Sequence, residues 1–122
     1  MPHLTLEYTA NLVDFDVASA LRRINQTVID SGLFDEGDVK SRAVPLKEFL
    51  VGIKSEGRTF LHLTVAMSAR GQGPESDMAK ALGEVLVEAL GSRRSYCTQA
   101  CVEIVHVNTS TYVKRVLDRA NV

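Results

Sequence analysis

The 122-residue sequence contains no tryptophan and only two cysteines, Cys97 and Cys101. Two cysteines are too few for the disulfide framework of a small exported domain, so both are expected to be free thiols. The three histidines, His3, His62 and His106, are scattered along the chain and do not have the spacing of a metal site. These sparse residues give no support for a secreted scaffold or for a structural metal.

The sequence also lacks a long apolar run and an excess of charge of either sign. No uninterrupted apolar stretch approaches the ~20 residues of a membrane span, and polar residues interrupt the N-terminus too early for a signal peptide. Lysines and arginines number 14 against 15 acidic residues, which gives no basic field for nucleic acid. We therefore expect a cytoplasmic protein with no membrane or nucleic-acid partner, folded as one domain over residues 1–122.

Two amphipathic segments are expected to form helices, over residues 16–31 and 75–90. In the first segment, apolar residues recur every three or four positions and make one stripe for the core, at Val17, Leu21, Ile24 and Val28. Gly32 is suited to end this helix because glycine tolerates the left-handed conformation. The second helix has Pro74 in its first turn and Gly91 at its end, which are typical start and stop signals.

Strands are indicated over residues 4–9, 59–67 and 100–107, with a further extended segment at 39–46. Pro45 cannot donate to a sheet ladder, so the segment that contains it belongs at a sheet edge. The segments at 4–9 and 59–67 each lead through a loop and a helix to another strand, which makes a weak internal repeat. The fold class is therefore α/β (α+β): two βαβ units with right-handed crossovers, in one sheet with both helices on one face.

A proline at position 2 is the feature that bears most directly on chemistry. If Met1 is removed, the Pro2 nitrogen becomes a secondary amine, held by the strand that follows. Unperturbed α-amino groups titrate near ~7.7–8.0, and burial or nearby positive charge lowers the pKa further. Such an amine is suited to abstract protons at neutral pH. Many proteins have proline second without any such role, so the signal depends on the rest of the chain.

The order and spacing of several segments resemble the tautomerase superfamily, and within it the 5-carboxymethyl-2-hydroxymuconate isomerase family. The likeness runs from residue 1 to about residue 107. It is carried by Met1-Pro2-His3 with the strand ending in Glu7, by Ser31-Gly32-Leu33-Phe34, Lys40-Ser41-Arg42, Phe60-Leu61-His62-Leu63-Thr64 and Glu75-Ser76, and by the helix around Gly83-Glu84-Val85-Leu86.

The resemblance implies a tautomerase-like fold that assembles as a homotrimer, with three sheets facing a central axis. It implies that Pro2 acts as general base and acid, moving a proton between the dienol hydroxyl and a carbon of a muconate-type dicarboxylate. It also implies that no metal or organic cofactor is used, and that the reaction belongs to the meta-cleavage breakdown of aromatic acids. Positive side chains would hold the substrate carboxylates.

The candidate substrate-binding residues are Lys40, Arg42, Arg70 and Gln72. Lys40 and Arg42 lie two apart, so in a strand they project from one face, and cations there would stabilise developing negative charge. Lys40 stands where the family has an arginine, and lysine lacks the two-pronged carboxylate contact of arginine. Gln72 also stands where the family tends to have arginine, with Arg70 two residues earlier. The start of the helix at 75–90 could add backbone donors.

Other interpretations of these residues remain open. Lys40 and Arg42 also fit a solvated edge strand, and Arg70 an exposed loop. The protein could be a tautomerase-family enzyme for another unsaturated acid, or a non-catalytic trimer that binds an anion. Glu7 and Tyr8 are interpreted first as structural or interface residues. The sequence after residue 107 leaves open whether the tail forms a helical turn or an arm.

Overall fold

The computed structural model describes residues 1–54, 56–92 and 96–118. The loop expected at 93–95 and the last four residues of the tail lie outside this part of the chain. The elements are β1 (His3–Thr9), α1 (Val17–Asp30), the short 3₁₀ helix η1 (Glu36–Asp38), β2 (Lys40–Leu46), β3 (Arg58–Met67), α2 (Gln72–Leu90), β4 (Cys97–His106) and the 3₁₀ helix η2 (Thr109–Thr111).

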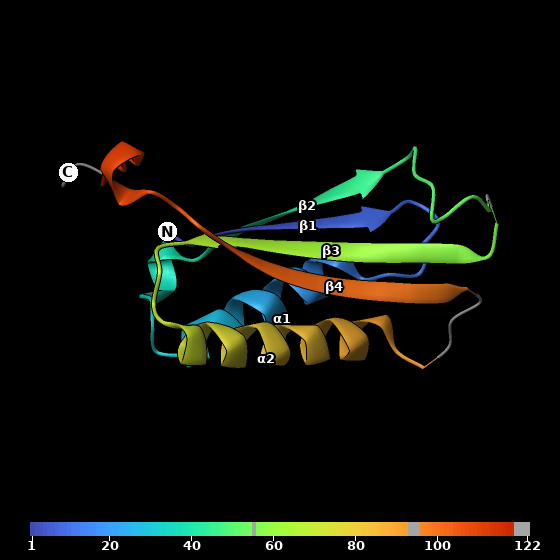
Figure 1. The fold of residues 1–122 in the computed structure, drawn as a ribbon, viewed down its shortest axis with the longest axis horizontal. Helices are drawn as coiled ribbons and strands as arrows, with labels where there is room; N and C mark the ends of the chain where they lie inside the picture. The colour runs from blue at the N-terminus through green and yellow to red at the C-terminus, as the bar shows by residue number, and fades with distance from the viewer. Residues whose placement is uncertain (55, 93–95, 119–122) are drawn as a thin grey trace.

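The four strands form one mixed sheet in the order β2-β1-β3-β4. β1 pairs in parallel with β2, and β3 in parallel with β4, while the central pair, β1 and β3, is antiparallel. Each parallel pair is joined through one helix, so the chain consists of two βαβ units, as the sequence predicts. Both helices lie against the same face of the sheet, which confirms the predicted layering (Figure 1).

The core lies between the two helices and the covered face of the sheet. Alternate residues of β1 and β3 point into it, because side chains of a strand alternate between the two faces. Residues of the helix stripes meet them there. The fully buried large side chains of this core are Leu4, Leu6, Ile24, Val28, Leu61, Leu63, Val65, Met67, Leu82 and Leu86. This burial fixes the register of β1, and with it the position of the residues that precede β1.

The ends of the helices follow from local residues. Asp16 caps α1, where its Oδ1 accepts a hydrogen bond from the Ser19 N–H at 3.1 Å. α2 begins at Gln72, three residues before the predicted start at 75. Gly71 takes a φ of +100° as its N-cap, a conformation that glycine reaches without the strain of a side chain. Among the described residues, neither helix has the length and apolar character to cross a membrane.

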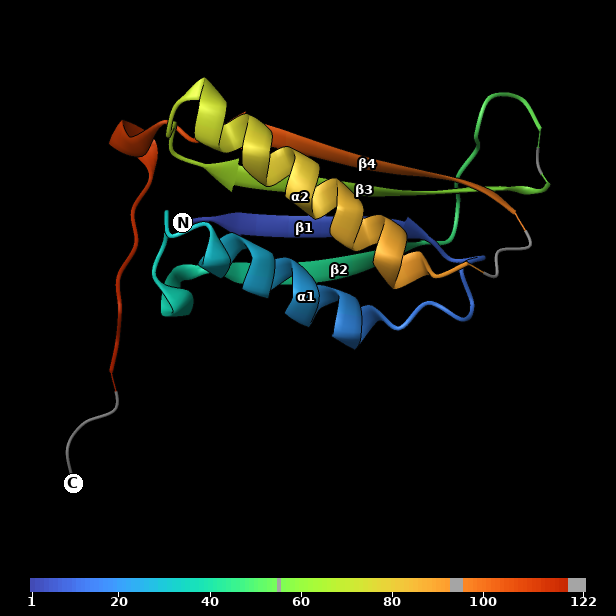
Figure 2. The same cartoon turned by 90° about the horizontal axis from the view of Figure 1, so that it is seen from below.

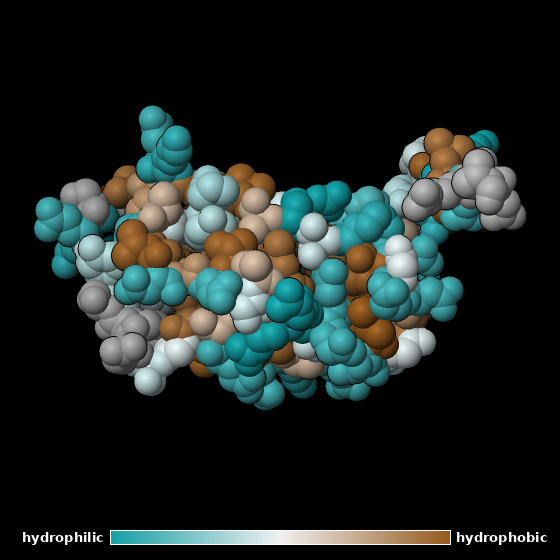
Figure 3. Space-filling view, turned by 180° about the vertical axis from the view of Figure 1, so that it is seen from behind, coloured by the Kyte–Doolittle hydropathy of each residue, from teal (hydrophilic) through white to brown (hydrophobic). Residues whose placement is uncertain are grey.

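One end of the sheet gathers the start of β1, the start of β2 and the ends of β3 and β4. The register sets His3 beside Lys40 on one side and Ala66 on the other. After β4 the chain runs across this end of the sheet, from the β4 side past the N-terminus to the β2 side (Figure 2). The described part of the tail beyond η2, residues 112–118, is called the arm. It stands out from the body of the molecule (Figure 3).

Candidate functional site

Pro2 lies buried at the start of β1, at the end of the sheet where the arm crosses. Its carbonyl oxygen accepts a hydrogen bond from the Lys40 N–H at 3.3 Å, which extends the β1–β2 pairing by one residue. Pro2 follows Met1 in this chain, so its nitrogen is an amide here. The backbone at Pro2 is nevertheless fixed by the sheet. The α-amino group of Met1, called the chain amine below, lies one residue away.

The chain amine is in a positively charged, partly buried environment. Burial is the main cause that holds the pKa of the Met1 α-amino group below its ordinary value. The positive charges of Lys40 and Lys114 add to this effect, as does a hydrogen bond with Lys40, while Asp38 opposes it. An amine at this end of the chain is therefore more often a free base at neutral pH than an exposed one.

The two predicted cations of β2 lie beside β1. The Lys40 ammonium donates a hydrogen bond to the carbonyl oxygen of Asp38, at the end of η1. The Arg42 Nη2 group lies 3.2 Å from Nδ1 of His3. Arg42 is exposed and Lys40 is half-buried, so both side chains remain accessible from the surface while each has one fixed contact.

The arm adds two residues that the sequence analysis did not single out. The Tyr112 hydroxyl lies 2.9 Å from Nε2 of His3, with the two rings edge to face. The Lys114 ammonium lies 2.7 Å from Oδ1 of Asp38. This contact lowers the pKa of Asp38 and raises that of Lys114, since each charge favours the charged form of the other. The arm thus places a second cation, after Lys40, beside the chain amine.

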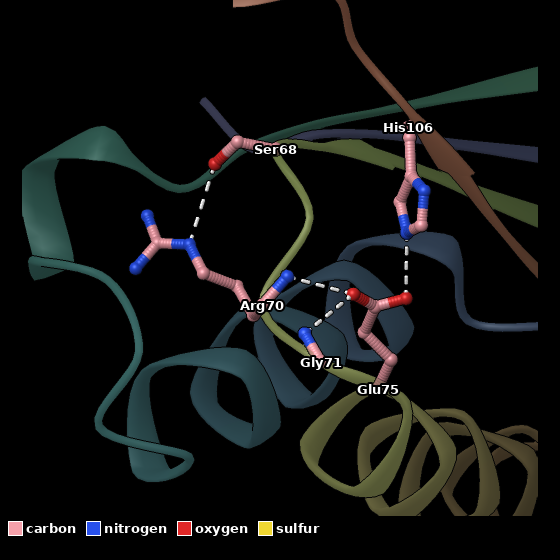
Figure 4. Close-up of polar contacts among 5 residues, drawn as sticks. All are labelled: Ser68, Arg70, Gly71, Glu75 and His106. Atoms are coloured by element: carbon pink, nitrogen blue, oxygen red, sulfur yellow. Dashed lines mark hydrogen bonds and ion pairs between the residues drawn. The ribbon is translucent and has the colours of Figure 1, made fainter.

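Arg70 reaches the same end of the molecule, from the loop after β3, but its guanidinium has several contacts. Its Nη1 donates to the Leu33 carbonyl oxygen at 3.1 Å, and its Nε to the Ser68 hydroxyl at 3.3 Å. Its guanidinium carbon also lies 4.5 Å from the centre of the Phe34 ring. In Figure 4 the guanidinium points away from Glu75. These contacts fasten the segment that leads from α1 to η1.

Gln72 is exposed at the first position of α2, beside a carboxylate that the helix start already holds. Glu75 Oε2 accepts hydrogen bonds from the N–H groups of Arg70 at 2.7 Å and Gly71 at 3.1 Å. Its Oε1 lies 2.6 Å from Nε2 of His106, at the end of β4 (Figure 4). The amide of Arg70 is the main cause that lowers the pKa of Glu75, followed by His106.

The Glu75 carboxylate therefore accepts hydrogen bonds from the backbone N–H groups before α2, the donors that were expected to be available to a substrate carboxylate. Gln72, Glu75 and His106 line an open depression of about 440 Å³ together with Ala69, Gly71, Ser76, Ala79 and Ile104. Its position beside the β3–α2 loop puts it next to, rather than at, the contacts of the chain amine.

The structure thus brings Pro2, Lys40 and Arg42 together around the start of β1, and places Arg70 in the neighbouring β3–α2 loop and Gln72 at the first position of α2. Four residues at this end of the sheet were not predicted from the sequence: His3, Asp38, Tyr112 and Lys114. His3 follows Pro2 directly in the motif that carries the resemblance, and this adjacency was the one available signal.

Comparison with known proteins places this geometry in a family. The model of the family described as 5-carboxymethyl-2-hydroxymuconate isomerase matches residues 2–114. A search of curated proteins found no match. The fold is similar to a solved 5-carboxymethyl-2-hydroxymuconate isomerase from Deinococcus radiodurans, with 26% identity, a TM-score of 0.80 and coverage of 93% of this chain and 88% of that one.

Two further solved structures share the fold. One is a 5-carboxymethyl-2-hydroxymuconate delta-isomerase, at 19% identity, a TM-score of 0.76 and coverage of 95% and 88%. The other is a fused 4-OT described as a symmetric trimer, at 12% identity, a TM-score of 0.66 and coverage of 85% of each chain. The family match extends over nearly the whole chain and includes Pro2, the β2 cations and the arm as far as Lys114. The chain belongs to the 5-carboxymethyl-2-hydroxymuconate isomerase family, within the tautomerase superfamily.

Proposed function

We propose that this isomerase uses Pro2, after removal of Met1, to move a proton within a 2-hydroxymuconate-type dicarboxylate. The observation that carries the proposal is the setting of the chain amine, beside Lys40 and Lys114 and partly buried, with a lowered pKa. Removal of Met1 would leave the amine on a buried, sheet-anchored residue one position further in. A rigid base of this kind meets the geometric requirement of general acid–base catalysis.

The proposed reaction conserves all atoms and needs no cofactor. The Pro2 nitrogen takes the proton from the dienol hydroxyl, and the electron pair left on oxygen is delocalised through the conjugated carbons to a carboxylate. The protonated proline then returns the proton to a carbon of the same chain. The product is the conjugated ketone, with one C–H bond gained, one O–H bond lost and the double bond shifted.

The β2 cations would stabilise the negative charge that develops in this step. Arg42 offers several N–H donors in a plane that matches a carboxylate, and Lys40 supplies charge without that fork. We assign the conjugated carboxylate to Arg42 and the developing charge near the amine to Lys40. Gln72, at the start of α2, would donate a neutral hydrogen bond to the far carboxylate, while a direct contact of Arg70 with substrate stays a prediction.

We propose that the working form is a homotrimer in the cytoplasm, acting in the meta-cleavage breakdown of aromatic acids. Both helices cover one face of the sheet, and the opposite face presents polar and mixed residues such as Thr5, His62 and Glu103. A sheet face without its own helices is a surface on which further copies can pack. The similarity to a fused 4-OT described as a symmetric trimer supports this assembly.

Two alternatives keep the same site. The substrate could be another unsaturated acid, since Lys40 and Gln72 both depart from the family arginines. The protein could also bind an anion without turning it over, if Met1 is retained and Pro2 stays an amide. The two are separated by turnover, because only the enzyme converts an enol to a ketone.

An ultraviolet assay of ketonisation tests the proposal, with 2-hydroxymuconate and its carboxymethyl analogue as substrates. We expect turnover by the wild type, a large loss of kcat in Pro2→Ala, and a rise of KM in Arg42→Ala. Loss of a charged hydrogen bond of about 1.5–3 kcal/mol corresponds to a roughly 10- to 150-fold rise. Arg22→Ala, an exposed arginine of α1, is the matched control. Activity that survives Pro2→Ala unchanged would overturn the proline mechanism, and saturable binding without turnover would favour the binding protein.

A further inference from the structure

The side chain of His3 bridges a β2 cation and the C-terminal arm. Its Nδ1 lies 3.2 Å from Arg42 Nη2, and its Nε2 lies 2.9 Å from the Tyr112 hydroxyl. Arg42 and His3 are separated by 39 residues in sequence, and His3 and Tyr112 by 109. Three segments of the chain therefore meet on one imidazole ring, directly beside Pro2.

The chemistry of the two partners fixes the protonation state of this ring. A guanidinium has only donors and does not lose its proton in proteins, so the Nδ1 of His3 must accept. The other ring nitrogen then carries the hydrogen, and Nε2–H donates to the oxygen of Tyr112. The neutral Nε2–H tautomer is the one form of His3 that satisfies both contacts.

The charges around His3 favour the same neutral form. Burial is the main cause that lowers the pKa of His3, followed by the positive charges of Arg42, Lys40 and the chain amine. Within the described part of the chain, these cations and the Tyr112 hydroxyl are the charged and titratable groups that face the ring, and the β3 residue at this register is Ala66. A protonated ring would turn an N–H toward Arg42 and break that contact.

We propose that Tyr112 is a positioning residue for the proposed reaction, which orients the Arg42 guanidinium toward the substrate carboxylate through His3. This inference rests on the proposed function, since it takes Arg42 as the group that binds substrate. Arg42 is an exposed side chain on an edge strand, where a free arginine samples many rotamers. Fixing it before substrate arrives reduces the ordering that binding requires.

The chain of contacts from Tyr112 through His3 to Arg42, here called the relay, also gives the arm a part in substrate specificity. Tyr112 lies just after η2 and is partly buried, whereas Val113 beside it is 75% exposed. The arm is therefore anchored to the site by Tyr112 and Lys114 while its apolar residues face outward. A change in the arm would reach the substrate through His3 and Arg42 without any contact of its own.

Nuclear magnetic resonance of the full chain with ¹⁵N-labelled histidine tests the relay without any substrate. At neutral pH we expect His3 to show a bare Nδ1, a protonated Nε2 and a slowly exchanging Nε2 proton. Tyr112→Phe should abolish the slow exchange, and Arg42→Ala should produce a mixture of tautomers. His62→Gln and His106→Gln assign the other two rings. A wild-type His3 that is an imidazolium, or the Nδ1–H tautomer, overturns the relay whatever the activity.

Kinetics then test whether the relay serves substrate binding. Loss of a neutral hydrogen bond corresponds to a rise in KM of about three- to tenfold, with kcat changed by less than about twofold. We expect this in Tyr112→Phe and in His3→Leu, and no further rise in the double variant, because both changes interrupt one chain of contacts. His3→Asn retains an acceptor for Arg42 but is too short to reach the Tyr112 hydroxyl, so its KM should rise about as much as that of Tyr112→Phe.

Tyr96→Phe is the control, because Tyr96 is an exposed tyrosine just before β4. Its carbonyl oxygen accepts a hydrogen bond from the Thr98 hydroxyl, and the substitution does not remove this bond. Effects of Tyr112→Phe and Arg42→Ala that simply multiply would overturn the relay. A wild type with no turnover would instead count against the proposed function, and the histidine spectra would still decide on the relay.

Discussion

Arg70 provides a sharp test, because its contacts argue for a role in the fold rather than in substrate binding. Arg70→Ala removes the hydrogen bonds to the Leu33 carbonyl and the Ser68 hydroxyl, and the stacking on the Phe34 ring at 4.5 Å. The backbone N–H of Arg70 still reaches Glu75, so the start of α2 is retained. The variant therefore measures how much the side-chain contacts of Arg70 with the segment before η1 contribute to stability.

The expected loss of stability follows from these contacts. A cation over an aromatic ring at an exposed site contributes about 0.5–1 kcal/mol. The guanidinium hydrogen bond to a neutral carbonyl adds a similar amount, about 0.5–1 kcal/mol, because water replaces much of it at an exposed site. The sum is about 1–2 kcal/mol, which lowers Tm by roughly 4–10 °C in a protein of this size.

The assay pairs thermal denaturation, followed by circular dichroism, with kcat/KM for 2-hydroxymuconate. We expect Arg70→Ala to lose stability and to reduce kcat/KM by less than about tenfold, well below the effect of Arg42→Ala. Arg70→Lys retains the charge without the planar fork and should fall between. A variant of unchanged Tm with a loss of kcat/KM greater than that of Arg42→Ala would refute this reasoning and make Arg70 a carboxylate ligand.

Three further changes have definite signs. Lys114→Met should move the acid limb of the pH–rate profile to higher pH, because a cation that lowers the pKa of the amine is lost. Asp38→Asn should move it to lower pH, because a carboxylate that raises this pKa is lost. Shifts of both variants in the same direction would contradict the roles given to these two charges. The pKa of Glu75 is lowered by folding, so its contribution is present above its unfolded-state pKa and lost as pH falls through its folded-state pKa. Thermal melts from about pH 6 to 3 should therefore show a shallower acid loss in Glu75→Gln than in the wild type. In urea denaturation, Leu63→Ala, at a fully buried position, should lower the free energy of unfolding by about 2–5 kcal/mol. Val87→Ala, half-exposed on α2, should lower it by less than about 0.5 kcal/mol. Equal losses in the two variants would contradict the assignment of Leu63 to the core.

The periodicity of the sequence predicted the two βαβ units because each unit has one buried face. The stripe in α1 and the alternation in β3 are local patterns with a direct structural cause. Boundaries were less certain where partners are distant. α2 starts three residues early because Gly71 and the carboxylate of Glu75 close the loop. β4 starts at Cys97, opposite Arg58 of β3, and such pairing leaves no mark in the local pattern.

Candidate site residues could be named from the sequence only where they lie in a recognisable local motif. Pro2 and the pair at 40 and 42 come from short segments with their own spacing. Tyr112 and Lys114 come from a tail of mixed polarity, and Lys114 meets Asp38 over a separation of 76 residues. No periodicity reports such a contact. The contacts of Arg70 with Leu33 and Phe34 are equally non-local, and only the folded chain shows that the guanidinium is already engaged.

The intact mass of untagged protein from its native source tests the central claim most directly. Pro2 can act as a base only if its nitrogen is a free amine, which requires removal of Met1. The account predicts a mass lower than that of the full 122-residue chain by one methionine residue. A mass that retains Met1 would leave Pro2 as an amide and contradict the proposed mechanism.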